Sequence, residues 1–155
     1  MSRKLSDLHP EVHWRAKAVI NLAWEIAIPV LITGTLRTFE EQATLYEQGR
    51  TKPGNIVTWA KAGESFHNYG IAFDFVPLKD GKPDWKDLEA FRRVGEIGED
   101  LELQWGGRWP KKDRPHLQVS FGFTVHELMV LHSLGGLPRV WQEIDEKIKK
   151  PVKTT

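Results

Sequence analysis

The spacing of apolar residues predicts two helices in the first third of the chain. Between residues 10 and 27, apolar side chains recur every three or four positions, and Pro10 suits the first turn of a helix. Thr38 and Glu41 have the spacing of a capping box, which predicts a short helix over residues 39–48.

Three more helices are predicted further along the chain. Asp84 can cap a helix that runs to Gly98, and a second capping box begins a helix over residues 124–134. An amphipathic helix over residues 137–148 follows, separated from it by Gly135-Gly136. The apolar face of the first of these helices would hold Trp85, Leu88, Phe91, Val94 and Ile97. That of the last would hold Leu137, Val140, Trp141, Ile144 and Ile148.

Three apolar runs, over residues 30–36, 71–76 and 116–121, predict β-strands. Because side chains alternate along a strand, each offers one apolar face and one face with an ionisable group. If the strands are neighbours, Arg37, Asp74 and His116 converge on one cleft, although each alone would be an ordinary solvent-facing position. The order of elements could suggest a doubly wound fold, but no glycine-rich turn follows the first strand.

Composition narrows the class of protein. A chain of 155 residues forms about one domain and can bury a core without disulfides or oligomerisation, so we expect a monomer. The 22 Lys and Arg balance 21 Asp and Glu, which argues against a nucleic-acid binder. The absence of cysteine excludes thiolate catalysis and cysteine zinc sites. No signal peptide or bilayer-spanning run is visible, so we expect cytoplasmic synthesis and no stable membrane insertion.

The segment SFHNYGIAFDF contains the most specific chemistry in the chain. It places His67 seven residues before Asp74, and a turn that leads into a strand can bring the two side chains together. His116 could complete a His₂Asp set for zinc, and Asp113, three residues before it, would lie near the open coordination position. A zinc ion held in this way acidifies bound water, and a nearby carboxylate then takes the proton.

These motifs resemble those of a known family. SFHNYGIAFDF matches the S-x-H-x-x-G-x-A-x-D pattern of the zinc D,D-peptidase and L-alanyl-D-glutamate peptidase family. DRPHLQ resembles its second motif, and GTLRTFEEQATLYEQGR is similar to its arginine-containing segment. The resemblance covers roughly residues 8–121 and extends to small phage endolysins and bacterial endopeptidases that cut between L-Ala and D-Glu of the peptidoglycan stem.

The resemblance implies an α+β fold of the hedgehog/D,D-peptidase-like type: one domain, a small mainly antiparallel sheet surrounded by helices, and a zinc cleft. It divides the chain into a catalytic core, residues 1–123, and a helical extension, residues 124–155, packed on the same domain. It makes His67, Asp74 and His116 the zinc ligands and Asp113 the general base. Arg37 would stabilise the oxyanion or bind a substrate carboxylate. Ser65 would line the site.

Other histidines and tryptophans have ordinary explanations. His9 and His13 lie four apart but lack the HExxH pattern, which favours surface or capping roles, and His126 and His132 are expected at the surface. Trp14, Trp24, Trp85 and Trp141 follow helical patterns and are expected in the core. Trp105 and Trp109, just before Asp113, are candidates for the cleft wall, and Trp109 for substrate binding.

The C-terminal lysines have two interpretations. They complement the dipole of a solvated helix end, or they attract the protein to an anionic envelope; nearby acidic residues favour the first. These lysines are Lys147, Lys149, Lys150 and Lys153.

The expected function is a zinc metallopeptidase of peptidoglycan stem peptides, most simply an L-alanyl-D-glutamate endopeptidase that lyses the cell wall after release from the cytoplasm. A D-alanyl-D-alanine carboxypeptidase or dipeptidase with the same zinc centre is an alternative. A non-catalytic zinc-containing wall-binding module is another. Residues 49–63 read as a long functional loop, where substrate specificity would reside.

Overall fold

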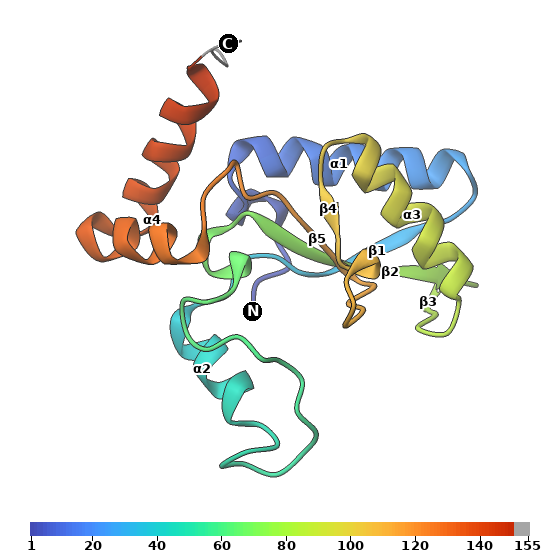
Figure 1. Cartoon of the computed structure of the whole chain (residues 1–155). Helices are drawn as coiled ribbons and strands as arrows, with labels where there is room; N and C mark the ends of the chain where they lie inside the picture. Colours follow the sequence, from blue (N-terminus) through green and yellow to red (C-terminus); the bar gives the residue numbers. More distant parts are fainter. Residues whose placement is uncertain (151–155) are drawn as a thin grey trace.

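An antiparallel sheet of five strands organises the molecule, whose computed structural model describes residues 1–150 (Figure 1). The main strand order is β1-β2-β5-β4, and β3 pairs with the far end of β2 through a turn at Asp80-Gly81, where both residues have positive φ. The strands are β1 (Val30–Gly34), β2 (Ala72–Lys79), β3 (Lys82–Pro83), β4 (Gln104–Trp105) and β5 (His116–Gln118).

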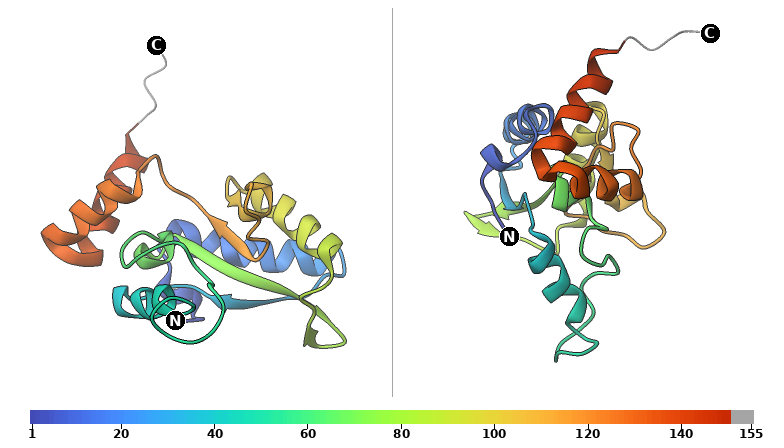
Figure 2. Two further views of the ribbon diagram at one scale, coloured as in Figure 1. Left: turned by 60° about the horizontal axis from the view of Figure 1, so that its bottom comes forward. Right: turned by 90° about the vertical axis from the view of Figure 1, so that its left-hand side faces the viewer.

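Helices α1 (Pro10–Glu25) and α3 (Leu88–Asp100) lie against each other over one face of the sheet (Figures 1 and 2). The core fills the space between these helices and the sheet. Val12 and Val19 of α1 and Phe73 and Phe75 of β2 are fully buried in it. This arrangement confirms the predicted α+β class with a mainly antiparallel sheet.

Two further helices lie away from this layer. Helix α2 (Phe39–Glu47) starts with the predicted capping box at Thr38 and projects with residues 49–63 as a separate lobe (Figure 1). As predicted, residues 49–63 contain neither helix nor extended strand. Helix α4 (Val125–Lys149) bends sharply at Gly135-Gly136, so it consists of the two predicted helical arms.

The second arm of α4 packs on the rest of the domain. Val140 and Ile144 are fully buried, and the indole N–H of Trp141 donates a hydrogen bond to the Tyr69 carbonyl at 2.8 Å. Ile148, which was expected on the same face, is 44% exposed. Lys147 donates to the Gly122 carbonyl, and Lys153 lies outside the described residues.

The register of the sheet brings ionisable residues to the face opposite the core. Asp74 on β2 pairs directly with His116 on β5, so both side chains point to the same side, and Gly34 of β1 lies opposite Asp74 on its other edge. The neighbouring positions Phe73 and Leu117 also pair, and both side chains are fully buried in the core. The alternation predicted from the sequence is therefore the alternation observed.

Several predicted boundaries were wrong. Helix α3 begins at Leu88 with Asp87, not Asp84, as its cap, and it continues through Gly98 to Asp100. Gly98 fits inside the helix because it faces the sheet: a Cβ there would lie 2.4 Å from the Leu117 side chain. The third predicted strand stops at Gln118, and the two-residue strands β3 and β4 are too short to show a periodic pattern.

The tryptophan predictions were also largely wrong. Trp14, Trp24 and Trp85 are 45%, 70% and 54% exposed, because helical spacing alone does not reveal how far an apolar face extends. Trp105, a candidate for the cleft wall, instead lies in the core, and its indole N–H donates to the Arg114 carbonyl. Trp141 is partly buried against the core, as expected.

Candidate metal centre and active-site cleft

His67 is positioned by a short 3₁₀ helix, η2 (Phe66–Tyr69). The Ser65 hydroxyl accepts a hydrogen bond from the His67 N–H, and the Asn68 side chain accepts one from the Ser65 N–H. Gly70 ends the turn at φ +67°, and a Cβ there would approach the Trp141 ring to 3.1 Å. The turn therefore directs a buried imidazole towards β2 and β5.

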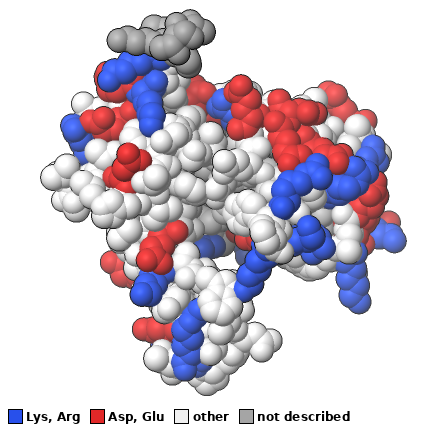
Figure 3. Space-filling view, viewed as in Figure 1, with Lys and Arg blue, Asp and Glu red and all other residues white. Residues whose placement is uncertain are grey.

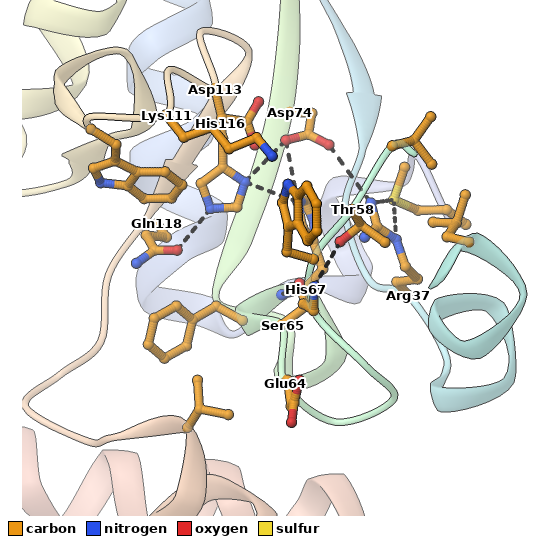
Figure 4. A pocket seen from close by; sticks show the side chains of 18 of the residues that line it. Arg37, Thr58, Glu64, Ser65, His67, Asp74, Lys111, Asp113, His116 and Gln118 are labelled. Atoms are coloured by element: carbon orange, nitrogen blue, oxygen red, sulfur yellow. Dashed lines mark hydrogen bonds and ion pairs between the residues drawn. The ribbon is translucent and has the colours of Figure 1, made fainter. Parts of the chain in front are cut away.

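Three side chains meet in a nearly equilateral triangle (Figure 4). His67 Nε2, Asp74 Oδ1 and His116 Nδ1 are each 3.2 Å from the other two. His67 and His116 are 2% and 6% exposed, so the triangle lies at the closed end of the cleft. The predicted convergence of these three residues is observed.

The dimensions and chemistry of the triangle fit a tetrahedral metal ion. Zinc lies about 2.0–2.1 Å from nitrogen and oxygen ligands, so ligand atoms in a tetrahedral site are about 3.4 Å apart, close to the observed 3.2 Å. If the three side chains held such an ion, the fourth tetrahedral position would be left open, and all three residues line the cleft. Two imidazoles and one carboxylate are also a ligand set used by catalytic zinc.

The remaining ring nitrogens are hydrogen-bonded away from the triangle. His67 Nδ1 donates to the Thr35 carbonyl at 2.7 Å, and His116 Nε2 lies 2.8 Å from Gln118 Oε1. Such outer contacts leave the nitrogen that faces the triangle with its lone pair, as a metal ligand requires.

The electrostatics of the triangle favour positive charge. Burial opposes ionisation of Asp74, but the adjacent His67 and His116 hold the pKa of its carboxyl well below the usual range. Burial would also lower the pKa of His116, but hydrogen bonding and attraction to Asp74, with Asp113 nearby, raise it. A partly buried carboxylate that retains its charge beside two imidazoles is favourable for a bound cation.

Asp113 lies at the mouth of the cleft, on the loop before β5. Its backbone N–H donates to the Gly106 carbonyl at 2.9 Å, and its own carbonyl accepts from the His116 N–H. A Cβ on Gly106 would lie 2.3 Å from the Asp113 carbonyl oxygen, so this close approach requires glycine. The side chain remains exposed to solvent on one side, but the surrounding cleft removes enough water to raise the pKa of its carboxyl.

Arg37 lies on the other side of Asp74 from His116 (Figure 4). Its guanidinium donates to Gln42 Oε1 at 2.8 Å and approaches Asp74 Oδ2 to 3.9 Å. Burial lowers the pKa of Arg37, and Asp74, Glu41 and Asp113 counter this effect. Arginine keeps its charge under such conditions, so the cleft contains a fixed cation beside the triangle.

The cleft itself has a volume of about 740 Å³ and lies between the sheet and the lobe formed by α2 and residues 49–63 (Figure 3). Ser65 and Trp109 line it, as predicted, and the Trp109 ring centroid is 5.2 Å from that of His116. Trp59, on the lobe, lies opposite this wall, and the ammonium of Lys111 is 3.7 Å from its ring centroid.

The other histidines do not join the cluster. His9 caps α1 by accepting from the Glu11 N–H, which confirms the capping interpretation, although its side chain is fully buried. His126 is exposed, but His132 is partly buried and stacks on Phe39 with ring centroids 4.4 Å apart, which corrects the surface prediction. Among residues 1–150, the three-residue cluster at the triangle is the one group that could hold a metal ion.

Some residues in and around the cleft were not predicted from the sequence. Gln118 could have been found, because it lies two positions after His116 and so shares its face of the strand. Trp59 gave no such indication, because its contact with Lys111 joins two loops that are far apart in the sequence. Gln42, which accepts a hydrogen bond from Arg37, was also not predicted; it is fully buried and does not line the cleft.

Comparison with known proteins identifies the family. Residues 58–119 match a family model of the M15 peptidases described as D-alanyl-D-alanine carboxypeptidase. The peptidoglycan L-alanyl-D-glutamate endopeptidase CwlK of Bacillus subtilis is 47% identical over 125 residues, 74% of each chain. The chain therefore belongs to the M15 peptidase family, which confirms the resemblance inferred from its motifs.

Solved structures support the fold. The L-Ala D-Glu endopeptidase ChiX of Serratia marcescens matches with a TM-score of 0.55 and 24% identity, over 76% of this chain and 84% of that one. A D,D-pentapeptidase VanY variant in complex with Zn(II) matches with a TM-score of 0.57 and 12% identity, over 92% and 84%. Within residues 1–150, no helix is both long and apolar enough to cross a membrane.

Proposed function

We propose that this chain is a zinc-dependent peptidase that hydrolyses the L-alanyl-D-glutamate bond of peptidoglycan stem peptides. The observation that carries the proposal is the triangle of His67, Asp74 and His116, which lies in a cleft between a carboxylate, Asp113, and a guanidinium, Arg37. The 47% identity to an endopeptidase of that specificity supports the choice of bond.

In this proposal, His67, Asp74 and His116 hold the zinc ion. When bound, zinc acidifies water and polarises the carbonyl of the scissile bond. Asp113 accepts the proton of the attacking water and passes it to the leaving amine. Its raised pKa suits a group that must both take and give a proton. Arg37 stabilises the negative charge that develops on the carbonyl oxygen, or it binds a substrate carboxylate.

The cleft supplies substrate contacts in addition to this chemistry. Ser65 lies beside His67 at the cleft surface, and Trp109 offers an aromatic face next to His116. We assign both to substrate binding. The catalytic core would comprise residues 1–123 and the extension residues 124–155, whose helix α4 supports the core through contacts such as Trp141 with Tyr69.

The first test is mass spectrometry of purified peptidoglycan incubated with the protein, with a chelator, and with the chelator followed by zinc. We expect chelator-sensitive release of fragments that carry a new D-Glu amino terminus. His67→Ala should release no fragments while keeping its circular dichroism spectrum, because the mutation removes one proposed ligand and His67 does not belong to the hydrophobic core cluster. Cleavage at full rate by metal-stripped protein or by His67→Ala contradicts the mechanism.

A second candidate is a D-alanyl-D-alanine carboxypeptidase, which the description of the matching family model favours. The same experiment separates the two: loss of terminal D-Ala alone, without new D-Glu termini, would identify the carboxypeptidase. Zinc binding together with binding to the wall, but with no product from any wall type, would identify a wall-binding module.

We further propose that the protein acts as a monomer on the cell wall after release from the cytoplasm, in the manner of an endolysin. Cutting stem peptides throughout the wall removes its crosslinked support, so the turbidity of a suspension of susceptible cells should fall when the protein is added from outside. Size-exclusion chromatography with light scattering should give a mass near 17.8 kDa.

A further inference from the structure

The outward-facing nitrogen of His116 begins a chain of side-chain hydrogen bonds that leads to the protein surface. His116 Nε2 is 2.8 Å from Gln118 Oε1, and Gln118 Nε2 donates to Gln104 Oε1 at 3.0 Å. Gln118 and Gln104 are directly paired across β5 and β4. Gln118 is 8% exposed, whereas Gln104 lies exposed on the edge strand. Figure 4 shows Gln118 on the side of His116 that faces away from Asp74.

The orientation of the Gln118 amide is linked to which nitrogen of His116 carries the hydrogen. A neutral imidazole has one N–H, so if His116 Nδ1, which faces the triangle, offers its lone pair to a metal ion, the hydrogen must be on Nε2. The Gln118 oxygen accepts from that N–H. If the amide were turned over, its NH₂ group would face Nε2 and would favour the other tautomer, with the hydrogen on Nδ1 inside the triangle.

The second imidazole has no comparable freedom. His67 Nδ1 donates to the Thr35 carbonyl, a backbone oxygen that cannot exchange with a donor. The tautomer of His67 is therefore fixed by the main chain. That of His116 is linked to a side-chain amide, whose NH₂ group donates to Gln104 Oε1.

We propose that Gln118 is a positioning residue that holds His116 in its metal-binding tautomer, and that Gln104 keeps the Gln118 amide in the required orientation. This inference rests on the proposed role of His116 as a zinc ligand, but not on which peptide bond is cleaved. Loss of an outer-shell partner of this kind weakens metal binding by roughly 10- to 100-fold.

The test compares three variants by their zinc dissociation constants, measured in competition with a chromophoric chelator. Gln118→Leu removes the acceptor at similar volume and should bind zinc roughly 10- to 100-fold more weakly. Gln118→Glu keeps an oxygen acceptor and should bind at least as tightly as the wild type. Gln104→Met, an exposed substitution, should weaken binding by a few-fold, and Gln142→Met on the exposed face of α4 is its matched control.

A spectroscopic readout reports the tautomer directly. In metal-free protein at alkaline pH, ¹⁵N-resolved spectra of the imidazoles should show a larger share of His116 with its hydrogen on Nε2 in the wild type than in Gln118→Leu, because Asp74 competes for a hydrogen on Nδ1 in both. Circular dichroism verifies that each variant is folded. If Gln118→Leu does not fold, the spectra of Gln118→Glu are compared with those of the wild type instead.

The outcomes separate this inference from the proposed function. Equal zinc affinity in wild type and Gln118→Leu overturns it, as does an equal loss in Gln118→Glu and Gln118→Leu, which would mark a role in packing. A wild-type protein without zinc affinity overturns both proposals. A wild-type protein that binds zinc and shows the expected order of variants, but cuts no L-Ala–D-Glu bond, supports the inference and contradicts the proposed function.

Discussion

At the scale of single residues, the site depends on polar groups that would be costly to bury without partners. Each corner of the triangle faces the other two at 3.2 Å, and each imidazole has a second partner outside it. The carboxylate stays ionised because the imidazoles offset the loss of water. Asp113 differs from Asp74 in this respect, since burial raises its pKa and no imidazole lies within hydrogen-bond distance.

This difference separates metal binding from proton transfer. Asp113→Asn keeps the size of the side chain but cannot accept a proton, so we expect kcat on a synthetic stem peptide to fall by roughly 10²–10⁴-fold. Zinc affinity should stay within a few-fold of the wild type, because Asp113 is not part of the triangle. Retention of more than a tenth of the activity, or a parallel loss of zinc, would rule out the role as general base.

Residue-scale expectations from the sequence succeeded where two local rules sufficed. The alternation of side chains along β2 and β5 and the tight turn at Gly70 bring His67, Asp74 and His116 together, and both features are visible in SFHNYGIAFDF and DRPHLQ. Their role as ligands stays a prediction. The contacts of Gln42 with Arg37 and with the Ala60 carbonyl depend on how a separate lobe packs, which no local pattern encodes.

At the scale of elements, the capping boxes of helices were predicted more reliably than the short strands of the sheet. The capping boxes that begin α2 and α4 use side chains three residues apart, so a short sequence contains the whole interaction. Strands β3 and β4 have two residues each and form only because a neighbouring strand offers hydrogen bonds. The predicted cap of α3 was Asp84, but the observed cap is Asp87, whose side chain accepts from the Ala90 N–H. Asp84 instead accepts from the Lys86 N–H, in the turn before the helix.

The cap of α1 also makes stability depend on pH. The side chain of His9 is fully buried and lies near Trp141 and Asp145 of α4, Phe121 and Glu11. Burial lowers the pKa of His9 below 6.5, although Asp145 and Glu11 counter this effect. The unfolded chain then binds a proton more readily than the folded chain. The stabilisation from neutral His9 is therefore present above pH 6.5 and is lost as the pH falls below it.

His9→Asn tests this sign, since asparagine can still cap the helix but does not titrate. The free energy of unfolding, measured with urea from pH 8 to pH 5, should fall more steeply for the wild type than for His9→Asn. His13 is a partly buried histidine on the same helix. The variant His13→Asn is therefore the matched control, and its curve should follow that of the wild type. Parallel curves for wild type and His9→Asn would show that His9 does not cause the loss.

At the scale of the whole molecule, the cleft exists because two distant loops face each other over the sheet. Residues 49–63 are tied to the body at their far end, where the Tyr69 hydroxyl donates to the Gly63 carbonyl at 2.6 Å. Within the lobe, Gln42 of α2 donates to the Ala60 carbonyl at 2.7 Å and accepts from Arg37 of the body. The opposite loop, which carries Asp113, is tied down at Gly106. These anchors leave Trp59 61% exposed at the rim.

Trp59 and Lys111 join the two loops across the cleft, which both residues line. The ammonium lies 3.7 Å from the indole centroid, a cation–π contact worth about 0.5–1 kcal/mol when exposed. Trp59→Ala removes this contact from the cleft wall, so it should raise KM for a stem peptide several-fold. Zinc affinity should stay unchanged, because neither side chain belongs to the triangle. Lys111→Met should act in the same direction, and the double variant should lose less than the sum of the two single effects, because either change already removes the shared contact.

Trp24→Ala, at a 70% exposed tryptophan on α1, is the matched control and should leave KM unaltered. If Trp59→Ala instead changes kcat or zinc affinity with KM constant, the two loops do not act as opposing walls of the substrate cleft, and specificity must come from the sheet side alone.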